Sequence, residues 1–306
     1  MTIVGIITNC LKDESKTIKE IYDAVWEERP GTEESSVRGR LNENEGRLFK
    51  RIARGVYVGI RGPAVCVVVS GDAWQRVKDI SDETIDAIIT DPPYDWLDEH
   101  YKTGTTRKKS GALGYETQNV DSELLREMFR VLKGRKVGPE GHIEGGAHCF
   151  LFVPAVTGMT IGPMSELIED AQNIGFCFNK LFVWDKLQIG MGYNGRNRYE
   201  GILFLSKGKR VMPGDMSIPD VLTYKKVHAE KRIHESEKPV ALLQTLLRFS
   251  CQPGDVVLDL FGGSMSLGEA ALNEGVNAIL FEKNEQFLDD ATRARNAYMQ
   301  SSLLEF

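Results

Sequence analysis

The sequence has no apolar run of the roughly 18 residues that a membrane-spanning helix needs. Its apolar N-terminal segment, residues 1–7, lacks the basic residues with which a signal peptide begins. The cysteines are scattered and form no CxxC pair: Cys10, Cys66, Cys149, Cys177 and Cys251. We therefore expect a cytoplasmic protein with reduced, buried cysteines and no metal site.

A phosphate-binding P-loop is also missing, because GK[ST] does not occur in the sequence. Phosphoryl transfer is therefore disfavoured. What the chain does have is a length of 306 residues and 42% hydrophobic content. These values allow one large domain with a substantial core, together with a small second unit.

The net charge of −6 argues weakly against a nucleic-acid partner, but the basic residues are unevenly distributed. Residues 38–61 contain seven basic and two acidic residues, and residues 207–232 contain seven basic and three acidic ones. Residues 107–109 form a third basic cluster. Any one such patch is more often a solvated surface. From the three together we predict DNA contacts by Arg38, Arg40, Lys50, Arg51, Arg54, Arg107, Lys108, Lys109, Lys225 and Lys226.

Residues 1–62 are expected to form a separate small unit. Apolar spacing predicts helices over residues 3–11, over residues 17–26 with Ser15 as cap, and over residues 33–44 with Thr32 as cap. Two short strands, over residues 48–52 and 55–60, are expected to follow. Three helices and a basic hairpin resemble a winged helix-turn-helix domain, which predicts DNA contact. The alternative is a helical unit that packs on the core or mediates protein contacts.

Residues 63–306 alternate strand-like and helix-like segments. The expected strands cover residues 65–69, 87–90, 149–153, 181–184, 201–205, 256–260 and 278–282. The expected helices cover residues 122–132, 164–174, 240–249, 268–274 and 286–300. This alternation predicts an α/β domain in which a largely parallel sheet has helices on both faces. The polar segments 95–118 and 207–237 do not fit it and are predicted to be loops that are functional or disordered.

The apolar segment 85–89 is followed by Thr90, Asp91, Pro92, Pro93 and Tyr94. The Asp91 carboxylate and the Pro92 carbonyl can both accept hydrogen bonds from an exocyclic amine. The ring of Tyr94 offers a face on which a base can stack. The motif is therefore suited to holding a nucleobase amine beside a methyl donor. The plainer interpretation is a strand that ends in a proline turn with its acid in water.

A second constellation begins with the apolar strand 256–260. Phe261, Gly262, Gly263 and Ser264 then form a turn of mostly small residues before a helix. Glycines let the backbone approach a ligand at the carboxyl edge of a sheet. The next strand ends at Glu282, where an acid can bind both hydroxyl groups of a ribose. Many nucleotide-binding folds share these features.

Together, the two constellations resemble the amino-group DNA methyltransferases, which use S-adenosylmethionine to methylate N6 of adenine or N4 of cytosine. Residues 91–94 are similar to the catalytic motif of that family, and residues 259–264 are similar to its D-x-F-x-G-S cofactor loop. Residues 234–239 resemble its H-P-T-x-K-P element, and residues 183–186 with 198–200 resemble its W-D-K…R-x-x-E stretch. The catalytic motif precedes the cofactor loop, as in the permuted β-type subgroup.

The resemblance implies a Rossmann-like S-adenosylmethionine-dependent methyltransferase fold over residues 63–306, with a recognition segment at about residues 207–237. Asp91, Pro92, Pro93 and Tyr94 would act on an adenine flipped out of double-stranded DNA, because DPPY favours adenine over cytosine. The implied cofactor is S-adenosylmethionine, with Asp72 near its adenine and Glu282 at its ribose. The full set of implied cofactor residues is Asp72, Lys238, Asp259, Phe261, Gly262, Gly263, Ser264 and Glu282. A homodimer and a cognate restriction nuclease are compatible with the family, but the sequence identifies neither.

Met265 stands where the family has a second glycine after the serine. It could crowd the methionine part of the cofactor, or its backbone could be in an ordinary conformation. Alternatives to DNA adenine methylation are N4-cytosine methylation, RNA adenine methylation, and protein glutamine methylation, whose motif has Asn in place of Asp91. A non-enzymatic winged-helix regulator with a degraded methylase domain is the alternative from another class, and Met265 is its main support.

Overall fold

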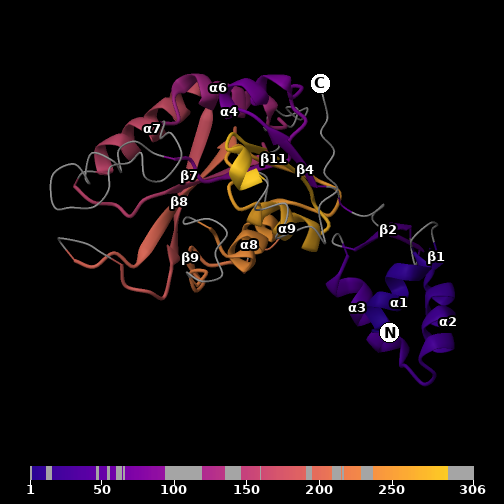
Figure 1. Ribbon diagram of the computed structural model, residues 1–306. Helices are drawn as coiled ribbons and strands as arrows, with labels where there is room; N and C mark the ends of the chain where they lie inside the picture. Colours follow the sequence, from indigo (N-terminus) through magenta and orange to yellow (C-terminus); the bar gives the residue numbers. More distant parts are fainter. Residues whose placement is uncertain are drawn as a thin grey trace, which may run out of the picture.

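The computed structural model contains an N-terminal region and a larger region with separate hydrophobic cores (Figure 1). The described residues are 2–11, 16–45, 48–53, 56–59, 64, 66–93, 119–134, 146–158, 160–190, 195–208, 215, 217–228 and 237–288. One buried cluster lies in the N-terminal region, and two lie in the larger region.

The N-terminal region combines three helices with a small antiparallel sheet. Its elements are α1 (Ile3–Cys10), β1 (Lys16–Thr17), α2 (Ile18–Glu28), α3 (Glu34–Glu43), β2 (Phe49–Ala53) and β3 (Val56–Gly59). The strands pair in the order β1-β3-β2. Ile7, Ile21, Val25, Val37 and Leu41 are fully buried, so the three helices share one apolar core.

Both expected helix caps in this region differ from those in the structure. Thr17 caps α2, and with Glu20 it forms a reciprocal capping box, whereas Ser15 lies outside the described residues. Glu33, not Thr32, occupies the cap position of α3 and makes no side-chain cap hydrogen bond. The Thr32 hydroxyl instead donates to the carbonyl of Arg29 (2.9 Å), which closes the turn between α2 and α3.

In the larger region, the described residues form an eight-stranded sheet in the order β4-β11-β10-β5-β6-β8-β7-β9. Its strands are β4 (Cys66–Ser70), β5 (Ala87–Thr90), β6 (His148–Val153), β7 (Phe176–Asp185), β8 (Tyr199–Lys207), β9 (Val221–Thr223), β10 (Val256–Asp259) and β11 (Asn277–Glu282). The helices are α4 (Ala73–Arg76), the 3-10 helix η1 (Val77–Asp79), α6 (Ser122–Val131), α7 (Ile161–Ile174), α8 (Val240–Ser250) and α9 (Ser266–Asn273).

Most of the sheet is parallel, which confirms the expected α/β class. β4, β11, β10, β5 and β6 are mutually parallel, and β9 is parallel to β7. The exception is β8, which is antiparallel to both β6 and β7. The described residues between β7 and β8, 186–190 and 195–198, contain no helix, whereas parallel neighbours need a longer crossover connection, usually a helix.

Helices cover both faces of the sheet, as expected. Figure 1 shows α6 and α7 on one side and α8 and α9 on the other. One buried cluster joins α8 and α9 to the sheet and includes the aromatic side chains of Phe150, Phe182, Phe204 and Phe249. The other joins α6 and α7 to the opposite face. The central strands are therefore buried on both sides, which explains their nearly continuous apolar sequences.

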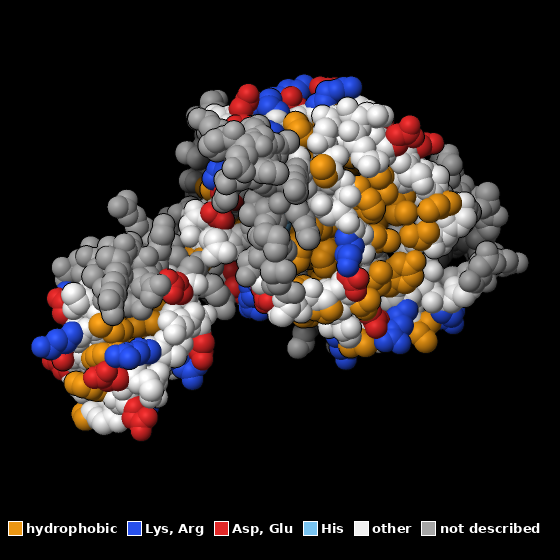
Figure 2. Space-filling model, turned by 180° about the vertical axis from the view of Figure 1, so that it is seen from behind, with side chains coloured by type: hydrophobic (Ala, Val, Ile, Leu, Met, Phe, Trp, Pro, Cys, Tyr) orange, Lys and Arg blue, Asp and Glu red, His pale blue; other side chains and the backbone are white. Residues whose placement is uncertain are grey.

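Several large hydrophobic side chains remain exposed at the β7–β9 edge of the sheet, the edge farthest from β4. They are Phe178, Leu187, Ile189 and Val221. Seen from behind, hydrophobic side chains gather over part of one face of the larger region (Figure 2). In the segments that the structure describes, no helix is both long and apolar enough to cross a membrane.

Candidate active site

The two predicted motifs lie together at the carboxyl ends of neighbouring strands. β4, β11, β10 and β5 are adjacent and parallel, so their carboxyl ends lie side by side. β5 ends before Asp91, β10 ends at Asp259 and β11 ends at Glu282, while β4 is followed closely by Asp72. The sheet therefore brings together residues that are far apart in the sequence, at the edge where open α/β sheets bind ligands.

Thr90 links the end of β5 to the end of β10. Its hydroxyl donates to Asp259 Oδ1 (2.7 Å) and accepts a hydrogen bond from the backbone N–H of Leu260 (3.2 Å). Thr90 and Asp259 are only 2% and 8% exposed. These hydrogen bonds fix Thr90, the residue before Asp91, against the start of residues 261–264, which we call the glycine turn. Sequence analysis missed this role of Thr90, whose only signal was a polar residue at the end of an apolar strand.

Asp259 is a buried carboxyl group with local partners. Its Oδ1 also accepts a hydrogen bond from the backbone N–H of Phe261 (3.0 Å). Burial raises the pKa of Asp259 to about 7, and the negative charges of Asp91 and Glu282 act in the same direction. The hydrogen bonds from Thr90 and Phe261 oppose this rise. The carboxyl group therefore organises the turn that follows β10.

The glycine turn is held by Glu282. Glu282 Oε2 accepts a hydrogen bond from the backbone N–H of Gly263 (2.7 Å), and Oε1 accepts one from Asn284 (2.8 Å). Burial raises the pKa of Glu282, while these backbone donors lower it. A Cβ on Gly262 would lie 3.1 Å from Met265 Sδ and 3.2 Å from the Phe281 carbonyl oxygen, so the turn has little room for a side chain there.

Met265 adopts a left-handed backbone conformation, with φ 58°, directly before α9. Of the two alternatives considered for Met265, an ordinary backbone conformation is therefore excluded. The side chain is 0% exposed and belongs to the hydrophobic cluster beneath α8 and α9. Met265 thus combines a conformation that favours glycine with a side chain that fills the core.

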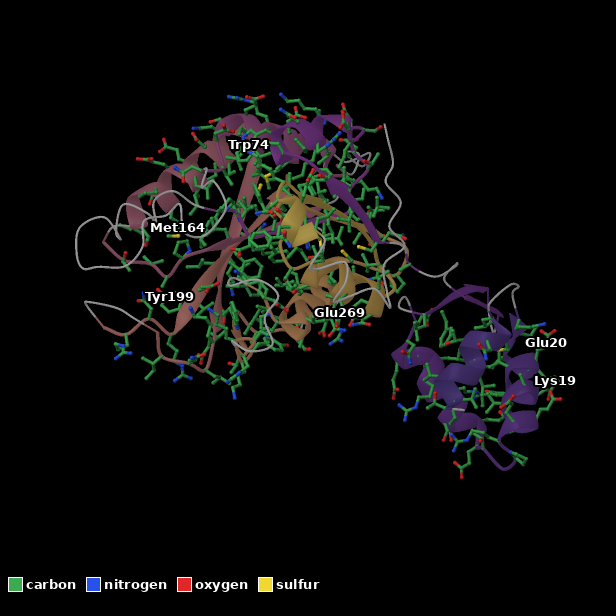
Figure 3. All side chains as sticks on the ribbon, viewed as in Figure 1. Lys19, Glu20, Trp74, Met164, Tyr199 and Glu269 are labelled. Atoms are coloured by element: carbon green, nitrogen blue, oxygen red, sulfur yellow. The ribbon has the colours of Figure 1, made fainter. Side chains whose placement is uncertain are left out.

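Asp72 lies beside the same turn. Its Oδ1 caps α4 by accepting a hydrogen bond from the Trp74 N–H (3.0 Å), and its Oδ2 lies 3.3 Å from Lys283 Nζ. The ring of Trp74, labelled in Figure 3, meets the ring of Phe261 edge to face, with 5.8 Å between centroids. Two aromatic rings and a carboxylate are therefore grouped next to the ends of β4 and β10.

Asp91 is paired with Lys238, which sequence analysis had assigned to the cofactor. The Lys238 ammonium donates to Asp91 Oδ2 and also lies 3.4 Å from Glu200 Oε2. The partly buried position of Asp91 raises the pKa of its carboxyl group, and the positive charge of Lys238 opposes this rise. Glu200, in the stretch that resembles R-x-x-E, therefore belongs to the surroundings of the catalytic motif.

The remaining residues predicted for the cofactor and catalytic sets are only partly described. Ser264 is buried, and its Oγ lies 2.8 Å from Ser266 Oγ. Pro92 and Pro93 follow Asp91 within the described residues, whereas Tyr94 lies outside them.

The predicted DNA contacts are only partly described. Arg38 is paired with Glu34 (3.3 Å) and donates to the Tyr22 hydroxyl, and Arg40 is paired with Glu43. Lys225 and Lys226 follow β9, and the charge of Lys226 acts on Asp91. The remaining predictions lie outside the described residues or side chains, namely those for Lys50, Arg51, Arg54, Arg107, Lys108 and Lys109.

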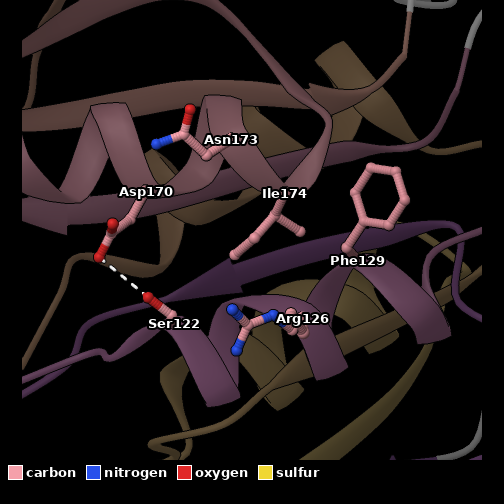
Figure 4. A pocket seen from close by; sticks show the side chains of 6 residues that line it. All are labelled: Ser122, Arg126, Phe129, Asp170, Asn173 and Ile174. Atoms are coloured by element: carbon pink, nitrogen blue, oxygen red, sulfur yellow. Dashed lines mark hydrogen bonds between the residues drawn. The ribbon is translucent and has the colours of Figure 1, made fainter.

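A separate pocket lies between α6 and α7 (Figure 4). Its lining residues are Ser122, Arg126, Phe129, Asp170, Asn173 and Ile174. The hydroxyl of Ser122 donates to Asp170 Oδ2 (3.1 Å) across it. None of the residues at the strand ends lines this pocket, so we do not connect it with the site.

Comparison with known families agrees with this arrangement. The DNA methylase family model, which covers N6 and N4 methyltransferases, matches residues 85–293. The chain therefore belongs to the DNA methylase family. This match includes both the strand before Asp91 and the strand that ends at Glu282.

Individual relatives have names consistent with the family. The type II methyltransferase M.HpaI of Haemophilus parainfluenzae is 27% identical over 248 residues, which cover 73% of this chain and 72% of that protein. The DNA adenine methyltransferase YhdJ of Escherichia coli is 26% identical over 251 residues, covering 72% of this chain and 79% of that protein.

Solved structures show the same fold. The M1.HpyAVI–SAM complex has a TM-score of 0.52 and 19% identity, and the match covers 76% of this chain and 100% of that one. The cytosine-N4-specific PvuII DNA methyltransferase has a TM-score of 0.52 and 17% identity, covering 79% of this chain and 96% of that one. These likenesses establish the methyltransferase fold of the larger region.

Proposed function

We propose that this protein transfers a methyl group from S-adenosylmethionine to the N6 amine of an adenine that is flipped out of double-stranded DNA. The observation that carries the proposal is the hydrogen bond between Thr90 and Asp259. It holds Thr90, the residue before Asp91, against Asp259 at the start of the glycine turn, which supports Asp91 as the residue that brings the target amine to the methyl donor.

The residues around the turn fit S-adenosylmethionine. Glu282 would hold the ribose hydroxyl groups, because its carboxylate lies at the end of β11 against Gly263. The rings of Phe261 and Trp74, with Asp72 beside them, would hold the adenine moiety. Gly262 keeps the turn close to β11, because protein atoms occupy the space that a side chain would need there. When bound, this cofactor supplies an electrophilic methyl group.

Asp91 and Pro92 would activate the target amine. The lone pair of an exocyclic amine is delocalised into the base, which makes the amine a poor nucleophile. Hydrogen bonds from its two N–H groups to the Asp91 carboxylate and the Pro92 carbonyl favour a pyramidal nitrogen, whose lone pair is available for attack. As nitrogen gains positive charge, the nearby carboxylate stabilises it without having to remove a proton first.

Adenine is the preferred base in this proposal because the motif begins with Asp, and the relative YhdJ is named as an adenine methyltransferase. Cytosine N4 is the second candidate, since the PvuII neighbour is named as specific for it. The buried side chain of Met265 weakens the case for a degraded methylase, because it packs in the core beneath the turn.

The test is to incubate the purified protein with methyl-labelled S-adenosylmethionine and, in separate reactions, with unmethylated duplex DNA, duplex RNA and protein. The DNA is then digested, and its nucleosides are identified by mass spectrometry. We expect N6-methyladenine within a short consensus sequence. N4-methylcytosine would overturn the base assignment. Label found only in RNA or protein would overturn the DNA assignment, and the absence of transfer to any of them would overturn the proposed activity.

We further propose that residues 1–62 form a winged-helix unit that contributes to DNA binding, while residues 63–306 carry the methyltransferase domain, with recognition by residues 207–237. The element order α1-β1-α2-α3-β2-β3 and the three-stranded antiparallel sheet support this assignment. In such units, the second helix of the helix-turn-helix lies in the major groove of DNA. Here that helix is α3, which carries Arg38 and Arg40.

A further inference from the structure

Four charged side chains from four parts of the fold meet beside the catalytic strand. Asp91 follows β5, Lys186 follows β7, Glu200 lies in β8 and Lys238 precedes α8. Lys238 Nζ contacts Asp91 Oδ2 and lies 3.4 Å from Glu200 Oε2. Lys186 Nζ lies 3.2 Å from Glu200 Oε1. Acids and bases therefore alternate along a chain of contacts, which we call the Asp91 cluster.

Lys238 is confined within the Asp91 cluster by more than its ion pairs. Its side chain is only 10% exposed. Its ammonium lies 5.0 Å from the centroid of the Phe152 ring and 6.0 Å from that of the Trp184 ring. Aromatic faces attract cations. Trp184 is itself fixed, because its indole N–H donates to the Tyr224 carbonyl (2.8 Å). The ammonium is therefore held where it reaches Asp91.

We propose that Lys238 is a positioning residue for methyl transfer. Its ammonium holds the Asp91 carboxylate ionised and oriented toward the target amine, and Glu200 keeps Lys238 in place. This inference rests on the proposed function. The family resemblance implied that Lys238 binds the cofactor. This proposal instead assigns Lys238 to the part of the site that holds the target amine.

The charges around Asp91 make this role physically useful. A buried carboxyl group tends to take up a proton, and a protonated Asp91 would stabilise developing positive charge poorly. The partly buried position and the nearby Glu200 raise the pKa of Asp91, while Lys238 and Lys226 lower it. The negative charge of Asp91 in turn raises the pKa of Asp259 on the neighbouring strand. Lys238 is the only one of these groups that hydrogen-bonds Asp91 in the described residues.

Lys238 and Glu200 remain charged in this arrangement. Burial raises the pKa of Glu200, but the positive charges of Lys238 and Lys186 outweigh it and hold that pKa below its usual value. Burial alone would lower the pKa of Lys238, but Asp91 and Glu200 outweigh this effect and raise it. The ion pairs therefore persist at the pH values at which Asp91 has to work.

Two substitutions should move the pH dependence of methyl transfer in opposite directions. In Lys238→Met, the pKa of Asp91 rises, so the acid limb of the single-turnover rate moves to higher pH. At neutral pH the rate should fall about a hundredfold, as expected when a reacting group is misplaced. In Glu200→Gln, Asp91 loses a charge that raises its pKa, so the acid limb should move to lower pH. Lys78→Met, which removes an exposed lysine paired with Glu123 (2.7 Å), is the matched control and should change neither.

The affinity for S-adenosylmethionine, measured by calorimetry on the same proteins, separates positioning from cofactor binding. We expect it to be unchanged in Lys238→Met. Weakened cofactor binding with an unmoved acid limb would overturn the proposal, as would shifts of the same sign in both variants. If Lys238→Met does not fold, Glu200→Gln and Lys238→Arg still test it, because Lys238→Arg keeps the charge and should keep the acid limb of the parent.

Failure of the proposed function can be distinguished from failure of this inference. If the parent methylates neither DNA nor RNA, the function is wrong, but the titration of Asp91 can still be followed by carbon NMR of its labelled carboxyl group. A higher pKa in Lys238→Met than in the parent would then still support the pairing. An identical pKa in the two proteins would overturn it.

Discussion

Asp91 is the side chain on which the proposed chemistry depends most directly. It follows β5, and in the described part of the chain its side chain hydrogen-bonds Lys238. Asp91→Ala should therefore slow methyl transfer by about a hundredfold or more, because a charged group that stabilises developing charge is lost. Its affinity for S-adenosylmethionine should change much less. Rates and calorimetric affinities measured together test this, and full activity in the variant would remove Asp91 from the mechanism.

At Asp259, the protonation state should affect stability. Burial raises the pKa of Asp259 to about 7, compared with about 3.9 in an unfolded chain. The folded protein thus binds this proton more tightly, so the resulting stability is present at low pH and is lost as the pH rises through about 7. We expect this component of the pH dependence to disappear in Asp259→Asn.

Urea unfolding at a series of pH values measures this effect. Asp79→Asn is the control, because Asp79 is an exposed carboxylate paired with Arg76. The control should keep the pH dependence of the parent. Parallel curves for the parent and Asp259→Asn would contradict the assignment of the raised pKa to Asp259.

Substitutions of Met265 compare the free-energy cost of its left-handed backbone with the stabilisation from its buried side chain. Truncating a buried methionine to alanine typically costs about 2–5 kcal/mol, and a left-handed backbone costs a non-glycine residue roughly 1–3 kcal/mol. Met265→Ala should therefore be destabilised, and Met265→Gly should be more stable than Met265→Ala because it loses the same packing without the strain. Denaturant unfolding of both variants checks this order. The reverse order would show that the left-handed conformation is not strained.

At the scale of elements, the N-terminal unit gives a test of DNA binding. A chain that begins near residue 63 should bind S-adenosylmethionine normally but bind DNA more weakly and with a shallower dependence on salt. Each lost phosphate contact reduces the slope of log affinity against log salt by about 0.9. Fluorescence anisotropy at several salt concentrations measures this slope. An unchanged slope with a lower melting temperature or a changed mass in solution would instead indicate a unit that packs on the core or pairs two copies.

The structure also limits what α3 contributes to that slope. Arg38 and Arg40 are each paired with a glutamate on the same helix. DNA phosphates would have to compete with those acids. We therefore expect the double substitution of Arg51 and Arg54 by Gln to lower the salt slope more than the double substitution of Arg38 and Arg40 by Gln.

The sequence predicted some elements well because their burial is uniform. β5 and β10 are short, largely buried apolar strands; β5 was predicted over residues 87–90, as observed, and β10 over residues 256–260, one residue longer than in the structure. β7 was expected over four residues but extends from Phe176 to Asp185, because much of it is exposed near the edge of the sheet. β1, β9 and α4 are two, three and four residues long and were missed, since such short elements have no measurable period.

At the candidate site, too, the sequence predicted only those features that are local in the chain. The motifs around Asp91 and Asp259 were readable because their residues are consecutive in the sequence. The contact between Lys238 and Asp91 joins residues 147 positions apart, and no local pattern reports such a pair. Glu200 and Thr90 acquired their roles in the same way, through strand neighbours that only the folded sheet defines.

For the whole molecule, the separate hydrophobic cores predict two unfolding transitions. The N-terminal cluster shares no residue with the two clusters that flank the large sheet. A ligand that binds one folded region raises the melting temperature of that region only. Differential scanning calorimetry should show that S-adenosylmethionine shifts the transition of the larger region and leaves the other unchanged. A single transition that shifts as a whole would show that the two regions unfold together.

The strand order also has a consequence for the way the protein is made. β4 and β5 are early strands of the large sheet, yet β11 and β10, which come last in the described chain, lie between them. During synthesis, the ribosome therefore releases β4 and β5 long before the strands that join them exist. Their unpaired edges must be kept from associating with other chains until then. The strand ends that carry Asp91 and Asp259 can come together only when β10 and β11 insert between β4 and β5, so a nascent chain that lacks these two strands has no complete site.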